Sequence, residues 1–228
     1  DELVKKIPDI KSIVNNITTR KSGVSIGEDE TTIYGNNFIK ERINGLTFNI
    51  SANSFFQTNT KQTEKLYSMI INESNLIGDE IVYDLYSGTG TIGISMAKHV
   101  KSVYGFEISD SSINDALINA KINNINNIKF FKGDLQNIFR VNSGTRKIKK
   151  PDIIIIDPPR AGMHKKTISD IIKKSPKKII YISCNPSTQA RDIKEFSDNN
   201  YKLKRVLPLD MFPHTPHVEN IAVLKKIK

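Results

Sequence analysis

The chain has a single cysteine, Cys184, among its 228 residues. One thiol cannot close an internal disulfide, and it cannot build a zinc or iron–sulfur centre that needs several cysteines. We therefore expect a reducing, cytoplasmic setting and no metal site. Long apolar runs are also missing, since runs such as 153–156 fall far short of the roughly 18 residues of a membrane span. No signal-peptide pattern opens the chain, so we expect no membrane association.

Polar tracts that would prevent folding are absent as well. Apolar residues make up 38% of the sequence and charged residues 25%, which is typical of a packed globular protein. The 34 Lys and Arg outnumber the 24 Asp and Glu, and the resulting net charge of +10 favours polyanionic partners. Residues 151–228 hold fifteen of the basic and eight of the acidic side chains, a net +7.

The length suits one medium domain with a small appendage. Residues 1–50 alternate β-branched or aromatic residues with polar ones, which predicts short antiparallel hairpins in a β-rich region. Residues 51–228 form the main domain, with a helix over 60–72 and then strands that alternate with helices. That pattern predicts an α/β fold with a mostly parallel, seven-stranded sheet. The expected strands are 81–86, 102–107, 128–131, 152–157, 178–183, 202–209 and 221–226.

A glycine-rich loop joins the first of these strands to a helix, at residues 84–93 (DLYSGTGTIG). Glycines let such a turn close tightly and let backbone N–H groups approach a ligand, at the sheet edge where doubly wound folds bind nucleotides. Gly88, Gly90 and Gly93 match the G-x-G-x-x-G pattern of dinucleotide sites. On spacing alone, an NAD site is one interpretation of this loop.

Three acidic residues argue against that interpretation. Asp84 precedes the glycines, where its charge would repel a pyrophosphate and attract a cationic ligand. Glu107 ends the second strand, where it could accept hydrogen bonds from ribose hydroxyls, and Asp134 follows the third strand. Together with the glycines, they resemble the S-adenosylmethionine site of Rossmann-like methyltransferases. The alternative is that they are surface acids beside an ordinary turn.

Two further strand ends carry unusual residues, 157–160 (DPPR) and 183–186 (SCNP). Both should face the ligand across the same edge of the sheet. The two prolines predict a stiff loop that holds Asp157 and Arg160 before any substrate arrives. A lone cysteine is more often a small buried hydrophobe than a nucleophile, but its position at a strand end favours a catalytic role for Cys184.

A group of polar residues precedes the last strand. His214, His217 and Glu219 could suggest a metal, but Pro216 breaks the helical spacing and no further strong ligand is near. A single acid or base is the better interpretation of this segment.

The sequence resembles the S-adenosylmethionine-dependent RNA uracil-5 methyltransferases, which make 5-methyluridine in transfer RNA and 23S ribosomal RNA. The matching pieces occur in the family's order across the main domain. They are 54–59 (SFFQTN), 84–93, Glu107, Asp134, 157–160, 183–186 and 217–219 (HVE).

The resemblance implies that Cys184 adds to C6 of a uracil and that Glu219 removes the C5 proton after methyl transfer. It makes Asp157 a third catalytic residue. The positions it assigns to S-adenosylmethionine are Gln57, Asp84, Tyr86, Gly88, Gly90, Thr91, Glu107, Asp134 and Asp157. The positions it assigns to the RNA are Phe55, Gln57 and Arg160.

The target carbon is unreachable in a stacked helix, so the uridine must be extruded. Phe55, Phe56 and Phe212 are candidates for stacking on a base, and we expect the basic excess of 151–228 to hold phosphates beside the site. We expect a monomer that acts on 23S ribosomal RNA, with uridine 54 of transfer RNA as the alternative.

The sequence departs from the family's pattern in three respects. The family usually carries an upstream RNA-binding barrel and often an iron–sulfur cluster, and neither occurs here. The sequence begins at Asp1, so we expect it to be the catalytic piece of a longer chain. Thr91 stands where an Asn is common.

Two other functions stay open at this stage. Amino methylation of a base uses similar loops, but Arg160 stands where an aromatic residue would be, and Cys184 would have no role. A catalytically silent RNA-binding module is the second alternative.

Overall fold

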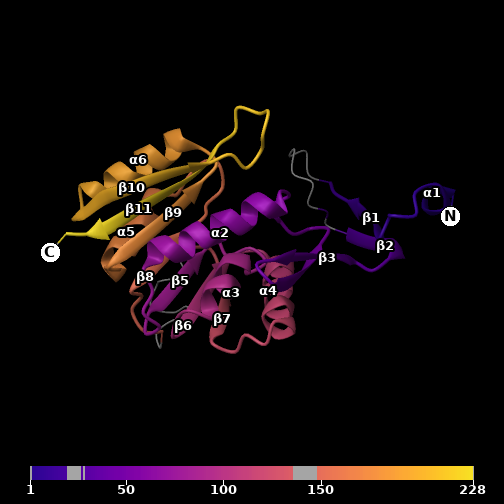
Figure 1. Cartoon of the computed structure of the whole chain (residues 1–228), viewed down its shortest axis with the longest axis horizontal. Helices are drawn as coiled ribbons and strands as arrows, with labels where there is room; N and C mark the ends of the chain where they lie inside the picture. Colours follow the sequence, from indigo (N-terminus) through magenta and orange to yellow (C-terminus); the bar gives the residue numbers. More distant parts are fainter. Residues whose placement is uncertain (1, 20–26, 28, 136–147, 228) are drawn as a thin grey trace.

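A seven-stranded sheet lies at the centre of the computed structural model, which describes residues 2–19, 27, 29–135 and 148–227 (Figure 1). Its strand order is β10-β11-β9-β8-β5-β6-β7. Strands β5 to β9 run parallel, whereas β11 is antiparallel to both β9 and β10. This confirms the predicted Rossmann-like methyltransferase fold. The strands are Ile81–Leu85, Ser102–Glu107, Ile128–Lys132, Ile153–Ile156, Lys178–Ser183, Tyr201–Leu209 and Glu219–Lys226, from β5 to β11.

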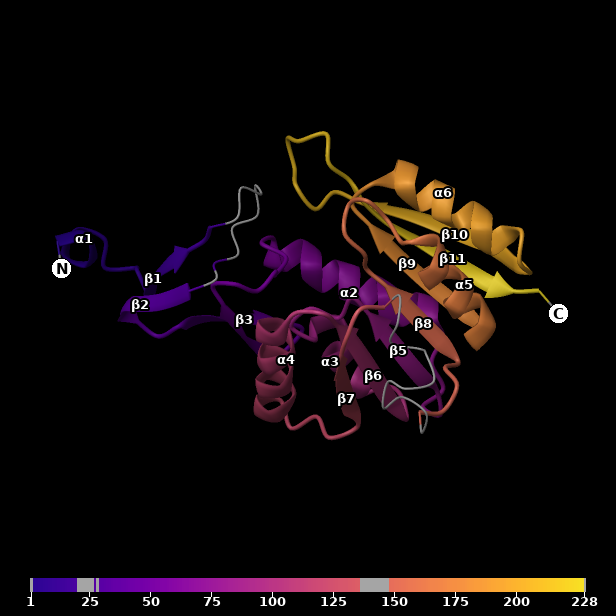
Figure 2. The same cartoon turned by 180° about the vertical axis from the view of Figure 1, so that it is seen from behind.

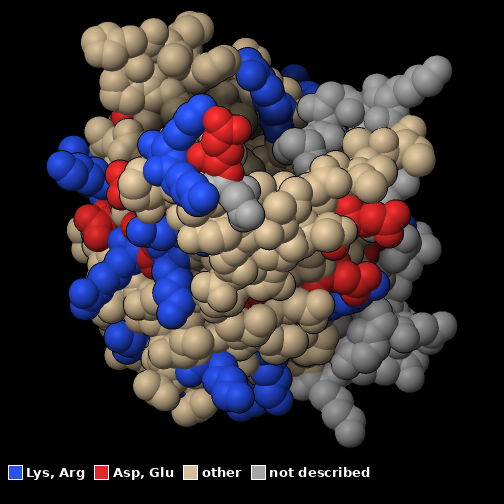
Figure 3. Space-filling model, turned by 90° about the vertical axis from the view of Figure 1, so that its right-hand side faces the viewer, with Lys and Arg blue, Asp and Glu red and all other residues tan. Residues whose placement is uncertain are grey.

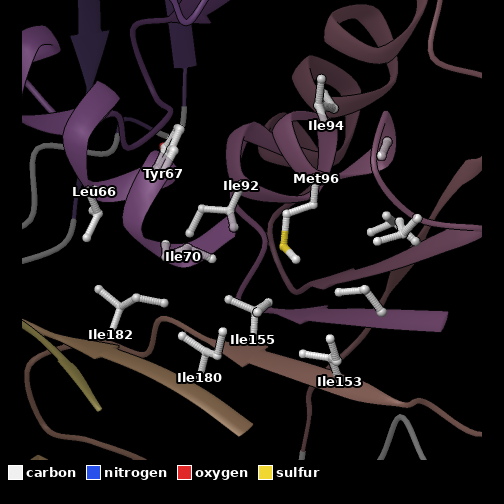
Figure 4. Close-up of a cluster of buried hydrophobic side chains, with 14 of the residues drawn as sticks. Leu66, Tyr67, Ile70, Ile92, Ile94, Met96, Ile153, Ile155, Ile180 and Ile182 are labelled. Atoms are coloured by element: carbon white, nitrogen blue, oxygen red, sulfur yellow. The ribbon is translucent and has the colours of Figure 1, made fainter. Parts of the chain in front are cut away.

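Helices cover both faces of the sheet (Figures 1 and 2). One face carries α2 (Thr60–Ser74), α3 (Thr91–Ala97) and α4 (Asp110–Ile122), and the other carries α5 (Lys165–Lys174) and α6 (Pro186–Ser197). Strand β8 is apolar on both sides because each side is covered. Ile153 and Ile155 pack under α2 and α3 (Figure 4), whereas Ile154 and Ile156 pack under the opposite helices.

The N-terminal part forms two antiparallel hairpins, as predicted. They are β1 (Ser12–Ile17) with β2 (Asp29–Gly35), and β3 (Phe38–Ile43) with β4 (Leu46–Ser51). A short helix α1 (Glu2–Lys6) precedes them. The first hairpin extends away from the sheet and β2 is exposed along its whole length (Figure 1), whereas β4 buries its apolar residues in the same core as α2. A division between 1–50 and 51–228 stays a prediction.

Helix α4 holds strand β4 through side chains that replace a neighbouring strand. Asn119 and Asn123 lie one helical turn apart, on the face that meets β4. Asn119 accepts from the N–H of Asn49 (2.7 Å) and donates to its carbonyl (3.1 Å). Asn123 makes the same two bonds to Thr47, at 2.9 and 2.6 Å. The polar backbone of β4 is therefore satisfied without a further strand.

The register of β9 and β11 places part of the basic excess far from the predicted catalytic residues. Lys178 pairs with Lys225 where β9 begins, and Ser183 pairs with Asn220 where it ends, next to Cys184. The strand has six residues, and each adds about 3.3 Å. The expectation that the basic residues of 151–228 lie beside the site is therefore wrong for this group.

The lysines at that far end have structural partners. Lys178 is buried, and its Nζ donates to the carbonyls of Glu73 (2.6 Å) and Ser74 (2.5 Å), which caps the C-terminal end of α2. The Nζ of Lys226 donates to the hydroxyl of Ser175. Nothing in the described ranges forms a helix both long and apolar enough to cross a bilayer.

Candidate active site

The glycine-rich loop turns sharply where β5 ends. Tyr86, Gly88 and Gly90 all have left-handed backbone conformations, with φ of 61°, 51° and 80°. The N–H of Gly90 closes the turn by donating to the carbonyl of Ser87 (2.8 Å), and a Cβ at Gly90 would lie 2.8 Å from the ring of Phe130. Glycine is therefore required there, whereas Tyr86 holds a conformation that is strained for a side-chain-bearing residue.

Asp84 lies beneath this loop and is 1% exposed. Its Oδ2 accepts from the N–H of Gly93 (2.9 Å), and a Cβ at Gly93 would lie 2.8 Å from that oxygen. Its Oδ1 has no hydrogen-bond partner within the described residues. Burial raises the pKa of Asp84 to about 7. A buried, unpaired carboxyl oxygen at a ligand-binding edge suits a donor or cation that arrives with a ligand.

Glu107, at the end of β6, connects the glycine-rich loop to the backbone that follows β6. Its Oε2 accepts from the N–H of Gly88 (3.0 Å), and its Oε1 accepts from the N–H groups of Ile108 (2.8 Å) and Ser109 (2.9 Å). A carboxylate has about four acceptor positions, so room is left for a ligand hydroxyl.

A cavity of about 250 Å³ opens beside these residues. It brings together three of the predicted cofactor positions, Tyr86, Glu107 and Asp134, with the loop that follows Asp157. Burial raises the pKa of Tyr86 to about 12. The lining residues are Tyr86, Phe106, Glu107, Ile108, Gly133, Asp134, Leu135, Pro159, Ala161, Gly162, His164 and Thr167.

Cys184 and Glu219 come together across two strands. Ser183 at the end of β9 pairs with Asn220 of β11, so Cys184 and Glu219 are the next positions along the same antiparallel pair. Glu219 is 3% exposed, and burial raises its pKa to about 7. Cys184 is half-buried. Burial is the main factor that raises the pKa of Cys184, followed by the charge of Glu219.

Asp157 and Arg160 lie in the same electrostatic environment. The N–H of Asp157 donates to the carbonyl of Leu85 at 3.4 Å, which places Asp157 beside the start of the glycine-rich loop. Burial raises the pKa of Asp157 well above its ordinary value, and the charges of Glu219 and Asp84 add to this. Arg160 opposes the carboxyl groups, since its charge lowers the pKa of Cys184.

The two neighbouring phenylalanines have different roles in the structure. Phe55 is 73% exposed, whereas Phe56 packs against the core, with its ring centre 6.4 Å from that of Phe48. Phe212 also packs against the core. Of the three candidates for stacking, Phe55 is the one with an exposed ring.

The loop between β4 and α2 carries both Phe55 and Gln57. Gln57 is half-buried. The loop is held at one end by the hydroxyl of Ser54, which donates to Asp115 (2.6 Å), and at the other by Asn59, which donates to the carbonyl of Met211 (3.0 Å). The Met211 contact joins this loop to the segment between β10 and β11, which leads to Glu219.

Two groups that support the site have no recognisable signal in the sequence. Tyr67 on α2, labelled in Figure 4, is 3% exposed, and its hydroxyl donates to the hydroxyl of Thr91 (2.7 Å). On sequence alone, Tyr67 is simply part of the apolar face of a helix. Arg191 and Asp192 on α6 hold the loop after Asp157. In the described part of the chain, no group of three or more His, Cys, Asp and Glu side chains is arranged to hold a metal ion.

Curated proteins that are similar to this chain are described as RNA methyltransferases. An uncharacterized RNA methyltransferase of Chlorobaculum tepidum is 45% identical over 94% of this chain and 44% of its own length. A second one, from Streptococcus mutans, is 42% identical over 99% of this chain and 50% of its own length. The chain thus spans about half the length of these curated relatives.

A solved structure is also similar to this chain. The Pyrococcus abyssi tRNA (uracil-54, C5)-methyltransferase, in complex with S-adenosyl-L-homocysteine, is 37% identical to this chain. The similarity has a TM-score of 0.79 and covers 97% of this chain and 52% of the other. A family model described as tRNA (uracil-5-)-methyltransferase matches residues 9–227. The chain therefore belongs to the tRNA (uracil-5-)-methyltransferase family.

Proposed function

We propose that the protein transfers a methyl group from S-adenosylmethionine to C5 of a uridine in RNA. The observation that carries this proposal is the convergence of Cys184, Glu219 and Asp157 beside the glycine-rich loop and its cavity. A thiol next to a buried carboxyl group is the pair that C5 methylation of uracil needs. The Pyrococcus abyssi neighbour, a uracil-54 C5-methyltransferase by name, supports the same chemistry.

The residues at the sheet edge fit S-adenosylmethionine. The unpaired Oδ1 of Asp84 suits an ammonium group, and the cavity beside Tyr86 and Glu107 suits the adenosine part. When bound, the cofactor supplies a methyl group on a positively charged sulfur. The carboxyl groups of Asp84, Asp157 and Glu219 favour a cation of this kind. The residues we assign to the cofactor are Gln57, Asp84, Tyr86, Gly88, Gly90, Thr91, Glu107, Asp134 and Asp157.

Cys184 activates the pyrimidine. Uracil C5 is too weak a nucleophile to accept a methyl group directly, so the Cys184 thiolate first forms a bond to C6. The electron pair of the C5–C6 double bond moves to C5 and O4, which makes C5 nucleophilic. Because burial and carboxyl charges raise the pKa of Cys184, the thiolate depends on the opposing charge of Arg160.

Glu219 resolves the covalent adduct. After methyl transfer, C5 carries both a methyl group and a hydrogen. The Glu219 carboxylate takes that proton, the electron pair restores the C5–C6 double bond, and the Cys184 thiolate leaves. A pKa of about 7 suits this base, because a carboxyl group then binds and releases a proton near neutral pH.

The uridine must leave its stack to reach Cys184, at a cost of roughly a few kcal/mol. The exposed ring of Phe55 is placed to offset this by stacking on a base, while Arg160 and Gln57 contact the substrate. Figure 3 shows the face on the side of the N-terminal hairpins, where Lys and Arg side chains stand on both sides of a hollow, with an acidic side chain between them at its rim. Phosphate groups of an RNA would find counter-charges there. We further propose that the protein acts as a monomer in the cytoplasm.

The target we put first is 23S ribosomal RNA, with uridine 54 of transfer RNA as the second candidate. The Pyrococcus abyssi neighbour, a tRNA (uracil-54, C5)-methyltransferase, favours that second candidate. The test is mass-spectrometric mapping of 5-methyluridine in ribosomal and transfer RNA from a strain that lacks the gene. Loss at one 23S position is expected, loss confined to transfer RNA would establish the second candidate, and no loss in either RNA would contradict the activity itself.

The same mapping separates the other functions. A methyl group lost from a nitrogen atom would indicate amino methylation. Binding of S-adenosylmethionine by the purified protein, without turnover on any uridine-containing RNA, would indicate a silent binding module.

A further inference from the structure

Helix α6 begins two residues after Cys184 and packs against the loop that follows Asp157. Asn185 is the N-cap of α6, and its Nδ2 donates to the carbonyl of Arg160 over 3.2 Å. The hydroxyl of Thr188, one turn into the helix, donates to the same carbonyl, also at 3.2 Å. The segment that carries the nucleophile is therefore bonded to the loop on the neighbouring strand end.

A second connection lies deeper in the helix. The side chain of Asp192 is 1% exposed, and its Oδ2 accepts from the N–H of Met163 (2.9 Å) and the hydroxyl of Tyr181 (2.8 Å). Its Oδ1 accepts from Nε (2.9 Å) and Nη2 (2.8 Å) of Arg191. The same Nη2 of Arg191 donates to the carbonyl of Ala161 at 3.0 Å. The two side chains thus bond the loop at both a carbonyl and an amide group.

The loop between these two bonds passes very close to the charged pair. Gly162 has a φ of 76°, and a Cβ there would lie 2.6 Å from Nη2 of Arg191 and 2.7 Å from Oδ2 of Asp192. This loop is also one wall of the cavity to which we assign the cofactor. The wall consists of Pro159, Ala161, Gly162 and His164.

We propose that Arg191 and Asp192 are positioning residues. They hold this cavity wall at a fixed position relative to the loop that carries Cys184. Neither residue lines the cavity. They act through the backbone of 161–163 on one side and through α6 on the other. The inference rests on the proposed function, because methyl transfer needs the cofactor and the nucleophile to meet on the same uracil. Misplacement by about 1 Å is enough to cost such a reaction about a hundredfold.

The test compares three variants of the whole protein. Arg191→Met removes the hydrogen bonds at similar length, and Arg191→Lys keeps the charge but loses the planar fork that bridges Asp192 and Ala161. Lys194→Met is the control, because Lys194 is an exposed cation on the same helix. The measurements are kcat, the KM values for S-adenosylmethionine and RNA, and the thermal midpoint. Calorimetry gives the affinity for S-adenosylhomocysteine.

We expect Arg191→Met to raise the KM for S-adenosylmethionine and to lower kcat, each by about tenfold, as loss of charge-assisted bonds would do. The KM for RNA should stay unchanged. Arg191→Lys should recover part of the loss, and Lys194→Met should match the wild type. Affinity for S-adenosylhomocysteine should fall in parallel with the KM.

Two results would overturn the inference. One is Arg191→Met with wild-type kinetics and affinity. The other is a lower kcat and thermal midpoint with both KM values unchanged, since that indicates fewer folded molecules and a merely structural pair. Failure of the proposed function is a distinct result, because the wild type would then show no turnover. The binding measurements on the variants would still test whether Arg191 and Asp192 hold the cavity wall.

Discussion

At the residue scale, the site is defined by one thiol and three carboxyl groups, of which Asp84 and Glu219 are buried and Asp157 is half-buried. Asp84, Asp157 and Glu219 all have raised pKa values, for which burial is the largest cause. The pKa of Cys184 is raised as well, first by burial and then by the charges of Glu219 and Asp157. Such an arrangement is unfavourable on its own, but it suits a cationic cofactor and a base that works near neutral pH.

Replacement of Glu219 by Gln should trap the covalent adduct. The amide cannot take the C5 proton, so Cys184 stays bonded to the methylated uracil. We expect an RNA adduct that survives denaturing electrophoresis, and a mass increase that matches one methylated RNA. Cys184→Ala is the control and should give neither adduct nor methylation. Full turnover by Cys184→Ala would refute the covalent mechanism.

Replacement of Arg160 by Gln should shift the reactivity of Cys184 to higher pH. The Arg160 charge lowers the pKa of the thiol, so its loss disfavours the thiolate and raises that pKa. The rate of alkylation by iodoacetamide, measured from pH 6 to about 10, should rise at a higher pH than in the wild type. Lys165→Gln removes an exposed cation from α5 and should leave the profile unchanged. An unchanged profile in Arg160→Gln would contradict the assigned role.

At the element scale, helix ends and strand ends are joined by side chains that bond to backbone groups. Asn119 is the clearest case, since it bonds to both backbone groups of Asn49 and also donates to the carbonyl of Thr89 in the glycine-rich loop (3.2 Å). One side chain thereby connects β4, α4 and the cofactor loop. On the opposite side of the sheet, Arg191 and Asp192 likewise connect α6 to the loop that follows Asp157.

Replacement of Asn119 by Ala should therefore destabilise the protein and weaken cofactor binding together. Asn119 is fully buried, and its loss leaves the backbone of Asn49 without partners, at a cost of about 2 kcal/mol or more. Urea unfolding should show the lower stability, and calorimetry with S-adenosylhomocysteine should show the weaker binding. Lys121→Ala, on the exposed side of the same helix, is the matched control. Unchanged unfolding in Asn119→Ala would contradict the bridging role.

At the scale of the whole molecule, the two buried acids Asp84 and Glu219 make stability depend on pH in an unusual direction. Their pKa values are about 7 in the folded protein, against 3.8 and 4.5 ordinarily. Between about pH 4 and 7 the folded state therefore binds more protons than the unfolded state. Stability without cofactor should fall as the pH rises through this window.

Thermal unfolding of the cofactor-free protein tests this expectation. The midpoint should be lower at pH 8 than at pH 5, and Asp84→Asn should show a smaller difference because it removes one of the acids whose pKa is raised. A midpoint that rises between those pH values in the wild type would contradict the assigned shifts.

Local patterns determined much of the fold. The seven strands were predicted within two residues of their observed bounds, because apolar runs and glycine turns reflect local physics that the sequence carries directly. Order along the chain also placed Asp84, Glu107, Asp157 and Cys184 at one sheet edge, since parallel strands end on the same side.

Only the tertiary structure decided how distant segments meet. It separated Phe55, which is exposed, from Phe56, which packs against the core, although the two have the same residue type in adjacent positions. It placed Lys178 and Lys225 at the end of β9 that lies away from Cys184. Because β11 runs antiparallel to β9, the last residues of β11 pair with the first residues of β9. It also revealed the contacts of Arg191 and Asp192, which depend on the packing of α6 against a loop about 30 residues earlier. Such pairings depend on strand direction and packing, which no local pattern in the sequence specifies.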